Sequence, residues 1–261
     1  MPSTPEASGS AVQREKGPAP ALELRSITAG YPGRPPVVRD VSLTVPAGES
    51  VALLGPSGCG KSTLARVAAL LHRPDAGSVS LHGAPVTGWR YRAPRAQRTS
   101  IGFVFQQPRT AADPRLTLAD LIAEPLRATR AVPRRDRAAA DEHVRPLAAS
   151  VGLTGDLLTR RPHEVSDGQL QRACLARALV LRPSLLICDE MTAMLDASTT
   201  ATLVNAVESY RAETGAALLA IGHDRPLLTR WCARLVDYPA LPVPASAGPR
   251  PPSLRETAHH H

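Results

Sequence analysis

The chain has few aromatic residues, almost no lysine and no long apolar segment. Aromatic side chains make up 3% of the 261 residues, which leaves few rings for base stacking and argues against a single-stranded nucleic-acid surface. No apolar run approaches the roughly 18 residues that a membrane helix needs. Residues 1–10 also lack the apolar centre of a signal peptide. We therefore expect a cytoplasmic protein that does not itself span a membrane.

The cysteines show no paired spacing. Cys59, Cys174, Cys188 and Cys232 are scattered along the chain without a CxxC pattern. Such spacing predicts free thiols in a reducing compartment and argues against a disulfide framework or a cysteine metal site.

The net charge of +8 has two interpretations. A basic protein can bind nucleic acid or an anionic membrane surface. The arginines are, however, dispersed through helical segments and loops, which favours an ordinary solvated surface. We expect no direct contact with nucleic acid, and the short cluster at Arg130, Arg134, Arg135 and Arg137 predicts the solvated start of a helix.

One of only two lysines lies in a glycine-rich loop. Lys16 and Lys61 are the lysines among 31 basic residues, and a broad arginine fork could not replace a compact ammonium in a phosphate pocket. Residues 55–63 match the phosphate-binding pattern GxxxxGK[ST]; they are Gly55, Pro56, Ser57, Gly58, Cys59, Gly60, Lys61, Ser62 and Thr63. In this pattern backbone N–H groups and a helix start, predicted here over about 61–71, hold phosphate oxygens. Lys61 would reach the β and γ phosphates and Ser62 would ligate Mg²⁺. The loop therefore predicts binding of a nucleoside triphosphate.

The order of apolar segments predicts an α/β protein with a helical insertion. Short apolar segments and turn signals over residues 22–54 indicate a small antiparallel sheet that leads into a buried strand. Residues 108–180 are rich in Ala, Leu and Arg, with helical spacing interrupted by prolines, and predict a helical lobe inserted into the core. Strands are predicted at residues 50–54, 79–81, 101–105, 184–188 and 216–221. We expect one domain at 22–238 between disordered, proline-rich ends at 1–20 and 239–261.

Two carboxylates follow the apolar strand at 184–188. Asp189 is placed to bind Mg²⁺ through water, and Glu190 to polarise an attacking water as general base. A surface turn could carry the same pair, but the apolar strand before it favours the metal site.

Five further polar or aromatic residues are candidates. Ser166 and Gln169 have the spacing of a capping box before a helical run at 170–181, and the same free helix start could bind a γ-phosphate from another molecule. Gln106 ends a predicted strand, where it could sense the metal or the attacking water. His223 follows the last predicted strand, and a lone Gln or His would more often be structural. Tyr31 could stack its ring on adenine, which by itself is a weak signal.

Taken in this order, the residues resemble the ATP-binding cassette ATPases over about residues 22–237. The resemblance implies an α/β P-loop NTPase core with an N-terminal antiparallel β subdomain and an inserted helical subdomain. It makes Tyr31 the adenine-stacking residue, 55–63 the Walker A loop, Gln106 the Q-loop residue and a metal contact, and Leu185 to Glu190 the Walker B segment. It also makes Asp196 the D-loop residue and His223 the switch histidine. Residues 165–169 match the LSGGQ signature, in which Ser166, Gly168 and Gln169 contact nucleotide.

The family implies ATP and Mg²⁺ as ligands and a head-to-tail dimer. Each ATP would lie between the Walker A loop of one subunit and the signature of a second, identical or different, ATPase subunit. Hydrolysis would drive transmembrane permease subunits, so the resemblance places the chain at the cytoplasmic face of the plasma membrane, and an extracellular solute-binding protein would act indirectly. Residues 103–126, with FVFQ, DPR and IAEPL, resemble the peptide and nickel importers, whose segment after the Q-loop contacts the permease.

The chain departs from the family pattern at several positions. Val165 and Asp167 replace the usual Leu and Gly of the signature. A carboxylate about 6 Å from a phosphate charge costs about 3 kcal/mol at an effective dielectric of ~20, so we expect the Asp167 side chain to point away from nucleotide. Met191 and Met194 replace residues around the Walker B and D-loop segments. The chain also lacks a clear closing β-hairpin after Val236 and the long C-terminal extension of many peptide importers.

Two alternatives to an importer subunit stay open. One is a soluble ATPase of this family acting on nucleic acid or ribosomes, although such proteins usually carry two cassettes or long coiled coils. The other is a regulatory partner in a heterodimer, whose altered signature serves the opposite site poorly. The histidines at 259–261 are either a tag remnant or natural, and they make a poor case for a metal site.

Overall fold

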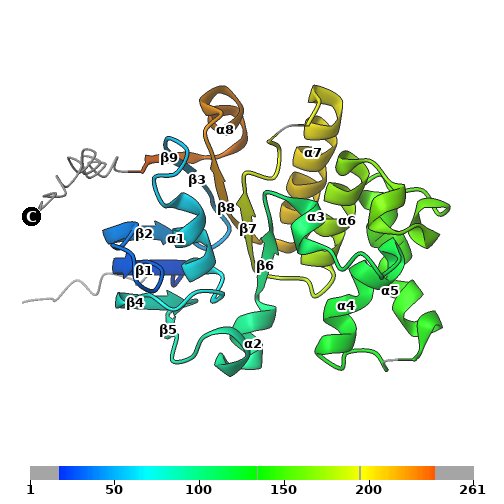
Figure 1. Ribbon diagram of the computed structural model, residues 1–261, viewed down its shortest axis with the longest axis horizontal. Coiled ribbons are helices and arrows are strands. Elements are labelled where there is room, and N and C mark those ends of the chain that lie inside the picture. The colour runs from blue at the N-terminus through cyan, green and yellow to red at the C-terminus, as the bar shows by residue number, and fades with distance from the viewer. Residues whose placement is uncertain (1–17, 134, 194, 239–261) are drawn as a thin grey trace, which may run out of the picture.

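The computed structural model describes residues 18–238, except 134 and 194. In this part of the chain two β-sheets and a group of helices follow one another along the long axis of the molecule (Figure 1). The end segments predicted at 1–20 and 239–261 lie almost wholly outside the described residues, as do the terminal histidines and Met194.

A four-stranded antiparallel sheet forms one end of the molecule (Figure 1). Its strands in spatial order are β2 (Val38–Val45), β1 (Leu22–Ala29), β4 (Ala76–Leu81) and β5 (Ala84–Pro85). Leu22, Leu24 and Ile27 of β1 are fully buried and share one apolar core with Leu64 and Val67 of helix α1 (Lys61–Ala68). This sheet is the antiparallel subdomain that the turn signals predict.

The central sheet is parallel and has five strands. In spatial order they are β6 (Ile101–Val104), β7 (Leu185–Asp189), β8 (Ala217–Gly222), β3 (Ser50–Leu54) and β9 (Arg234–Asp237). Every residue of β3, β7 and β8 is buried, as expected for strands covered on both faces. Because the strands are parallel, the carboxyl ends of β3, β6, β7 and β8 meet at one edge of the sheet.

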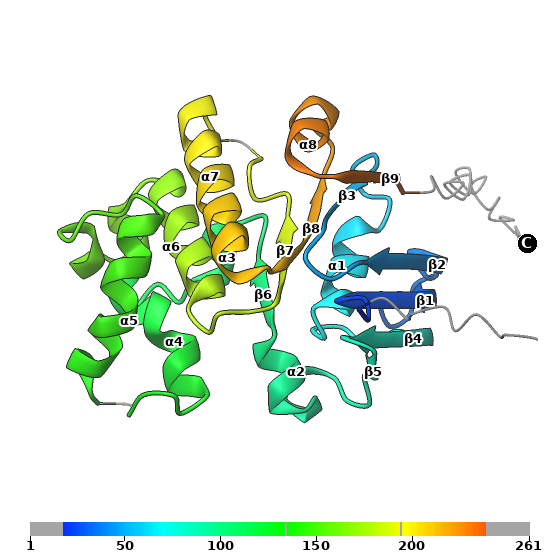
Figure 2. The ribbon, with the colours of Figure 1, turned by 180° about the vertical axis from the view of Figure 1, so that it is seen from behind.

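Helices form the opposite end of the molecule, and both views place α4 and α5 far from the antiparallel sheet (Figures 1 and 2). Helix α6 packs against α3, α4, α5 and β6, so it joins the helical part to the central sheet. The helices of this part are α3 (Pro108–Ala111), α4 (Leu118–Ala128), α5 (Arg137–Ser150), η2 (Leu157–Thr159), η3 (Pro162–Glu164) and α6 (Asp167–Leu179). The remaining helices are η1 (Arg90–Arg92), α2 (Arg95–Thr99), α7 (Ala197–Thr214) and α8 (Arg225–Trp231).

Helix α1 is shorter than the prediction of 61–71. It ends at Ala68, and Leu70 has a left-handed φ of 60°. The N–H groups of Leu71 and His72 both donate to the carbonyl of Arg66, at 2.8 and 3.0 Å. The chain therefore turns back over its last helical turn before Pro74, which cannot continue a helix.

The sequence prediction missed strand β9. This strand pairs parallel with β3 at the edge of the central sheet. It has only four residues, its ends are exposed and its middle is half-buried, so it lacks the apolar run that marks β3, β7 and β8. The other predicted strands are present with bounds shifted by a few residues, as in β4, which begins at Ala76 and not at Val79.

A helix needs about 20 apolar residues to cross the hydrocarbon core of a lipid bilayer. Among residues 18–238, apart from the two omitted positions, no helix has both the length and the apolarity to span it.

Candidate functional site

The phosphate-binding loop joins the carboxyl end of β3 to the first turn of α1. Gly60 takes a left-handed φ of 109° at the helix start, and a Cβ there would lie 2.5 Å from the carbonyl oxygen of Val37. Only glycine fits such a position without displacing the backbone. The loop is therefore held against the segment before β2.

Lys61 is buried beneath this loop. Its ammonium donates to the carbonyl oxygens of Gly55 and Pro56, at 2.9 and 2.8 Å, and lies 3.7 Å from Oε1 of Glu190. Only 3% of the side chain is exposed. A charge with this burial needs such partners, and the contacts place the ammonium at the floor of the loop.

Asp189 meets the loop from the end of β7. The Ser62 hydroxyl donates to Oδ1 of Asp189 at 3.1 Å, although the two residues are 127 positions apart. Burial raises the pKa of Asp189 above 3.8, and the hydrogen bond from Ser62 opposes that shift. A buried carboxylate beside a hydroxyl is a hard oxygen donor set, which fits Mg²⁺. These two residues form the candidate metal site, to which the sequence prediction also assigns Gln106.

Glu190, the residue after Asp189, has a strained backbone. Its φ is 46°, uncommon for a residue with a side chain, and its N–H donates to the carbonyl of Ile221 at the end of β8, at 2.9 Å. This geometry aims a carboxylate that is only 9% exposed back toward Lys61. Strain of this kind is concentrated at functional sites.

Gln106 and His223 lie on the two sides of Glu190. The Gln106 amide donates to Oε2 of Glu190 at 2.7 Å, and Nδ1 of His223 lies 3.7 Å from Oε1. The structure therefore brings together three side chains from the ends of β6, β7 and β8 that are far apart in sequence.

A cavity of about 330 Å³ lies over the loop, and we call it the phosphate cleft. It is lined by Tyr31, Val37, Ser57, Gly58, Gly60, Lys61, Ser62, Thr63, Gln106 and Glu190. The Tyr31 hydroxyl lies 3.4 Å from Oγ1 of Thr63 and accepts a hydrogen bond from Arg66 at 3.0 Å. These hydrogen bonds, that with Thr63 first, lower the pKa of Tyr31 below 10. Val37 and Arg66 were missed from sequence, where neither belongs to a motif.

The signature residues lie outside this cleft. Ser166 and Gln169 form a complete capping box: the Ser166 hydroxyl accepts from the Gln169 N–H at 3.2 Å, and the Gln169 side chain accepts from the Ser166 N–H at 3.0 Å. None of residues 165–169 lines the phosphate cleft. Within one subunit the signature and the phosphate-binding loop are therefore separate.

The Asp167 carboxylate turns toward α3. Its Oδ1 lies 2.6 Å from Nε of Arg109, and this arginine also donates to the carbonyls of Pro162 and Val165. Sequence reasoning missed Arg109, because no pattern links it to a segment 50 residues away.

Asp196 caps α7 beside the signature. Its carboxylate accepts from the N–H and hydroxyl of Thr199, at 2.8 and 2.7 Å, and these bonds, the backbone one first, lower its pKa below 3.8. A Cβ on Gly168 would lie 3.0 Å from Cγ2 of Thr199. The starts of α6 and α7 are therefore in close contact. Asp196 does not line the phosphate cleft.

The cysteines and Met191 are structural residues, and only Cys59 lies in the loop. Cys59 is half-buried near Lys61, whereas Cys174, Cys188 and Cys232 are buried free thiols. Met191, at 2% exposure, is part of the apolar core, as its side chain allows.

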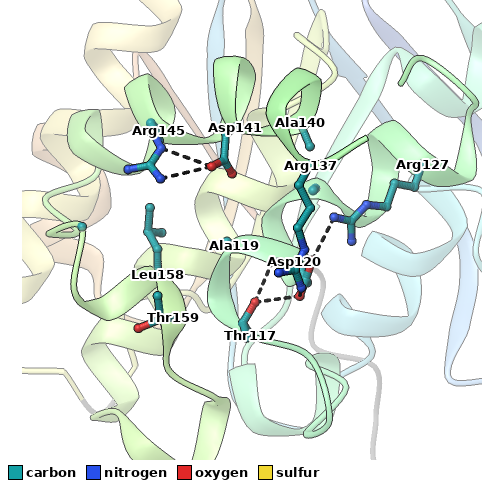
Figure 3. A pocket seen from close by; sticks show the side chains of 12 residues that line it. Thr117, Ala119, Asp120, Arg127, Arg137, Ala140, Asp141, Arg145, Leu158 and Thr159 are labelled. Atoms are coloured by element: carbon teal, nitrogen blue, oxygen red, sulfur yellow. Dashed lines mark hydrogen bonds and ion pairs between the residues drawn. The ribbon is translucent and has the colours of Figure 1, made fainter. Parts of the chain in front are cut away.

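A second cavity of about 330 Å³ lies among α4, α5 and η2 (Figure 3). Its charged side chains are paired with one another: Arg127 lies 2.8 Å from Asp120, and Arg145 lies 3.1 Å from Asp141. This cavity contains none of the motif residues, so the phosphate cleft is the stronger candidate site.

Comparison with known proteins supports this choice. A protein-family model described as ABC transporter matches residues 38–193, which include the phosphate-binding loop and both carboxylates. A probable peptide ABC transporter ATP-binding protein of Sinorhizobium fredii is 41% identical over 213 residues, covering 78% of this chain and 60% of that protein. The nickel import ATP-binding protein NikE of Escherichia coli K12 is 39% identical over 200 residues, covering 77% and 74%. The chain thus spans three-fifths of the length of the rhizobial relative.

Solved structures show the same architecture. The cassette MJ0796, described as a dimeric bacterial ABC transporter cassette, aligns with a TM-score of 0.73 at 25% identity, covering 83% of this chain and 93% of that one. The fold also matches cbiO1 of Clostridium perfringens, part of the cbiONQ transporter complex, with a TM-score of 0.69 at 23% identity and 84% coverage of each chain. The chain belongs to the ABC transporter family and is an ATP-binding cassette ATPase, as the phosphate-binding loop, the two carboxylates and these matches show.

Proposed function

We propose that this chain hydrolyses ATP as the nucleotide-binding subunit of an ABC importer. The observation that carries the proposal is the arrangement around the phosphate cleft, where Lys61, the Ser62–Asp189 pair and the Gln106–Glu190 pair converge. The cleft has the residue types that phosphoryl transfer needs: a cation for the phosphates, oxygen donors for a metal and a carboxylate for the attacking water.

Each side chain has a distinct role in this proposal. Lys61 exchanges part of its bonding to the loop carbonyls for β and γ phosphate oxygens. Ser62 and Asp189 would hold Mg²⁺, with Gln106 nearby, and the bound metal would supply positive charge to the phosphates. Glu190 accepts a proton from the attacking water, while Gln106 and His223 orient its carboxylate and the transferred group. Tyr31 offers its ring to adenine.

The site is half of a composite one. Ser166, Gly168 and Gln169 lie outside the phosphate cleft of their own subunit, yet the free N-terminus of α6 suits a phosphate oxygen. We therefore assign them, with Asp196, to the ATP of a second cassette subunit in a head-to-tail dimer. The related cassette MJ0796 is described as dimeric, which supports the assignment.

Peptides, nickel or a related small solute are the proposed cargo class. The relatives named for peptide transport and nickel import support this class at 41% and 39% identity. The cargo would be chosen by permease subunits and by an extracellular solute-binding protein. The chain would then work at the cytoplasmic face of the plasma membrane.

A groove beside the Q-loop strand is the proposed permease contact. It has a volume of about 610 Å³ and is lined by Arg66, Ala69, Leu70, Leu71, Arg90, Tyr91, Arg98, Ile101, Phe103 and Phe105. Tyr91 is 76% exposed, and exposed rings with a basic rim mark interaction surfaces. We assign one occupant, a helix of a transmembrane permease subunit.

Turnover and nucleotide binding test the proposal together. Glu190→Gln keeps shape but removes the base, so it should lower Mg²⁺-dependent phosphate release by at least about a hundredfold while retaining ATP binding. Lys61→Ala should weaken ATP binding itself, and Lys61→Arg should not restore it, because an arginine fork does not fit the buried pocket. Full turnover by Glu190→Gln would contradict the assignment of Glu190 as the general base. Arg182→Ala, which removes an exposed pair with Glu213, is the matched control and should behave like the parent.

A further inference from the structure

One guanidinium bridges the Q-loop segment and the signature. Arg109 lies on α3, three residues after Gln106. Its two terminal nitrogens donate to the carbonyls of Pro162 and Val165, at 2.9 and 3.2 Å. Its Nε pairs with the Asp167 carboxylate at 2.6 Å. All three nitrogens are therefore used on the loop that leads into α6.

Side chains of α6 also bind the segment that carries Gln106. The amide of Gln171, which is 1% exposed, donates to the carbonyl of Phe105 at 3.1 Å, and Arg177 donates to the carbonyl of Ala111 at 2.7 Å. Both side chains belong to α6, and both carbonyls flank the segment that carries Gln106. Residues 105–111 are thus fixed to α6 from its first turns to its last turn.

The negative charge of Asp167 indicates a second role for Arg109, which is to neutralise that charge. Asp167 is the first residue of α6, next to Ser166, which is the helix cap. An unpaired carboxylate at this point would repel an anion arriving at the helix start, whereas the pair with Arg109 neutralises it. The two side chains are 49% and 64% exposed, and a pair this exposed adds little to folding stability. Its effect should therefore appear in binding at the helix start.

We propose that Arg109 is a positioning residue that holds the signature in register with the Gln106 segment and cancels the charge of Asp167. The proposal rests on the composite site of the proposed function. Gln106 contacts Glu190 in its own phosphate cleft, while Ser166 serves the ATP of the opposite subunit. Arg109 thereby links the two ATP sites through a single subunit. The link consists of residues 106–109 and the Arg109 side chain.

The test uses variants of the full chain that carry Glu190→Gln, so that bound ATP persists. Arg109→Gln, Asp167→Gly, the double variant and Arg109→Lys are compared with this parent. Arg145→Gln removes an exposed arginine that pairs with Asp141 on α5 and is the matched control. ATP affinity of the monomer is measured with a fluorescent nucleotide, ATP-driven association by sedimentation, and folding by thermal denaturation.

Arg109→Gln should weaken ATP-driven association about tenfold, a loss of ~1.4 kcal/mol, with monomer ATP affinity and melting temperature close to those of the parent. The double variant with Asp167→Gly should recover only part of this loss, because the carboxylate is gone but the hydrogen bonds of Arg109 to Pro162 and Val165 are still missing. Arg109→Lys should recover part of it, since lysine keeps the charge but not the fork. Arg145→Gln should match the parent.

Two results would overturn the proposal. Parent-like association of Arg109→Gln would remove the positioning role, and a double variant as weak as Arg109→Gln alone would remove the neutralising role. A parent that binds ATP but does not associate would instead contradict the composite site of the proposed function, and a parent that does not bind ATP would contradict its nucleotide site.

Discussion

Asp189 is a candidate metal ligand whose buried charge lowers the stability of the folded protein. The carboxyl group is 4% exposed, and it receives one hydrogen bond, from Ser62. Burial raises its pKa in the folded protein above 3.8. An acid whose pKa is raised by folding binds its proton more tightly in the folded state, so its ionised form destabilises the fold. The destabilisation is present at neutral pH and is relieved as the pH falls through the raised pKa.

Asp189→Asn should therefore stabilise the nucleotide-free protein. The substitution keeps the shape and removes the buried charge, so the melting temperature at neutral pH should rise by a few degrees, at about 2–4 °C for each kcal/mol. This advantage should shrink as the pH is lowered, because the parent then gains its proton. Mg²⁺-dependent ATP hydrolysis should be lost over the whole range. Thermal denaturation at several pH values checks the first two outcomes, and an unchanged or lower melting temperature at neutral pH would contradict the argument.

The neighbouring Glu190 could be recognised as a candidate from sequence, but its geometry could not. The order of an apolar strand followed by two acidic residues predicts carboxylates at a strand end. Its left-handed φ and its backbone bond to Ile221 arise because β8 lies beside β7. That neighbourhood depends on strand order, which local sequence does not encode. The same reason explains why the contact of Ser62 with Asp189 becomes visible only in the fold.

Ser166, the residue that caps α6, is also a candidate phosphate ligand. Ser166 accepts from the Gln169 N–H and so stabilises the start of the helix. A replacement that lacks an acceptor at this position typically costs about 1 kcal/mol. Substitutions at Ser166 can therefore separate the helix-capping role from the phosphate-binding role.

Ser166→Ala and Ser166→Asp should have opposite profiles. Ala removes the cap, so the free energy of unfolding should fall by about 1 kcal/mol, with partial loss of ATP-driven association. Asp is a good cap, so stability should stay near that of the parent, but its charge beside an incoming phosphate should abolish association. Chemical denaturation and sedimentation with ATP measure the two effects. Parent-like association of Ser166→Asp would argue against any contact between Ser166 and a phosphate.

The sequence predicts an element correctly where its apolar pattern is strong. It misses an element whose formation depends on tertiary contacts. Strands β3, β7 and β8 are continuous apolar runs, and all three were predicted. Strand β9 is short and half-buried, and it forms because β3 offers an unpaired edge. The prolines in the helical part also mislead, because α4 continues across Pro125 and α5 across Pro146, where packing against α6 offsets the lost hydrogen bonds.

The separation of the two halves of the ATP site governs how subunits should cooperate. The phosphate cleft is lined by residues that follow β1, β3, β6 and β7 but by none from the signature, so under the proposed function each ATP needs two copies. The sequence predicts both motifs, yet one chain read alone cannot show on which face each lies. Because the signature does not line the phosphate cleft of its own copy, the proposed function predicts that turnover requires a dimer.

Two linked copies of the chain can test this requirement directly. Lys61→Ala disables one phosphate cleft, and Ser166→Asp disables one signature. If both changes lie in the same copy, the intact cleft faces the damaged signature and the damaged cleft faces the intact one, so turnover should be almost absent. If the changes lie in different copies, one complete site remains, and about half of the parent turnover should survive if the sites act independently. Phosphate release from purified tandem proteins distinguishes the two arrangements. The reverse pattern, with about half of the turnover when both changes lie in one copy and almost none when they lie in different copies, would mean that each copy completes its own site, and the head-to-tail arrangement would have to be abandoned.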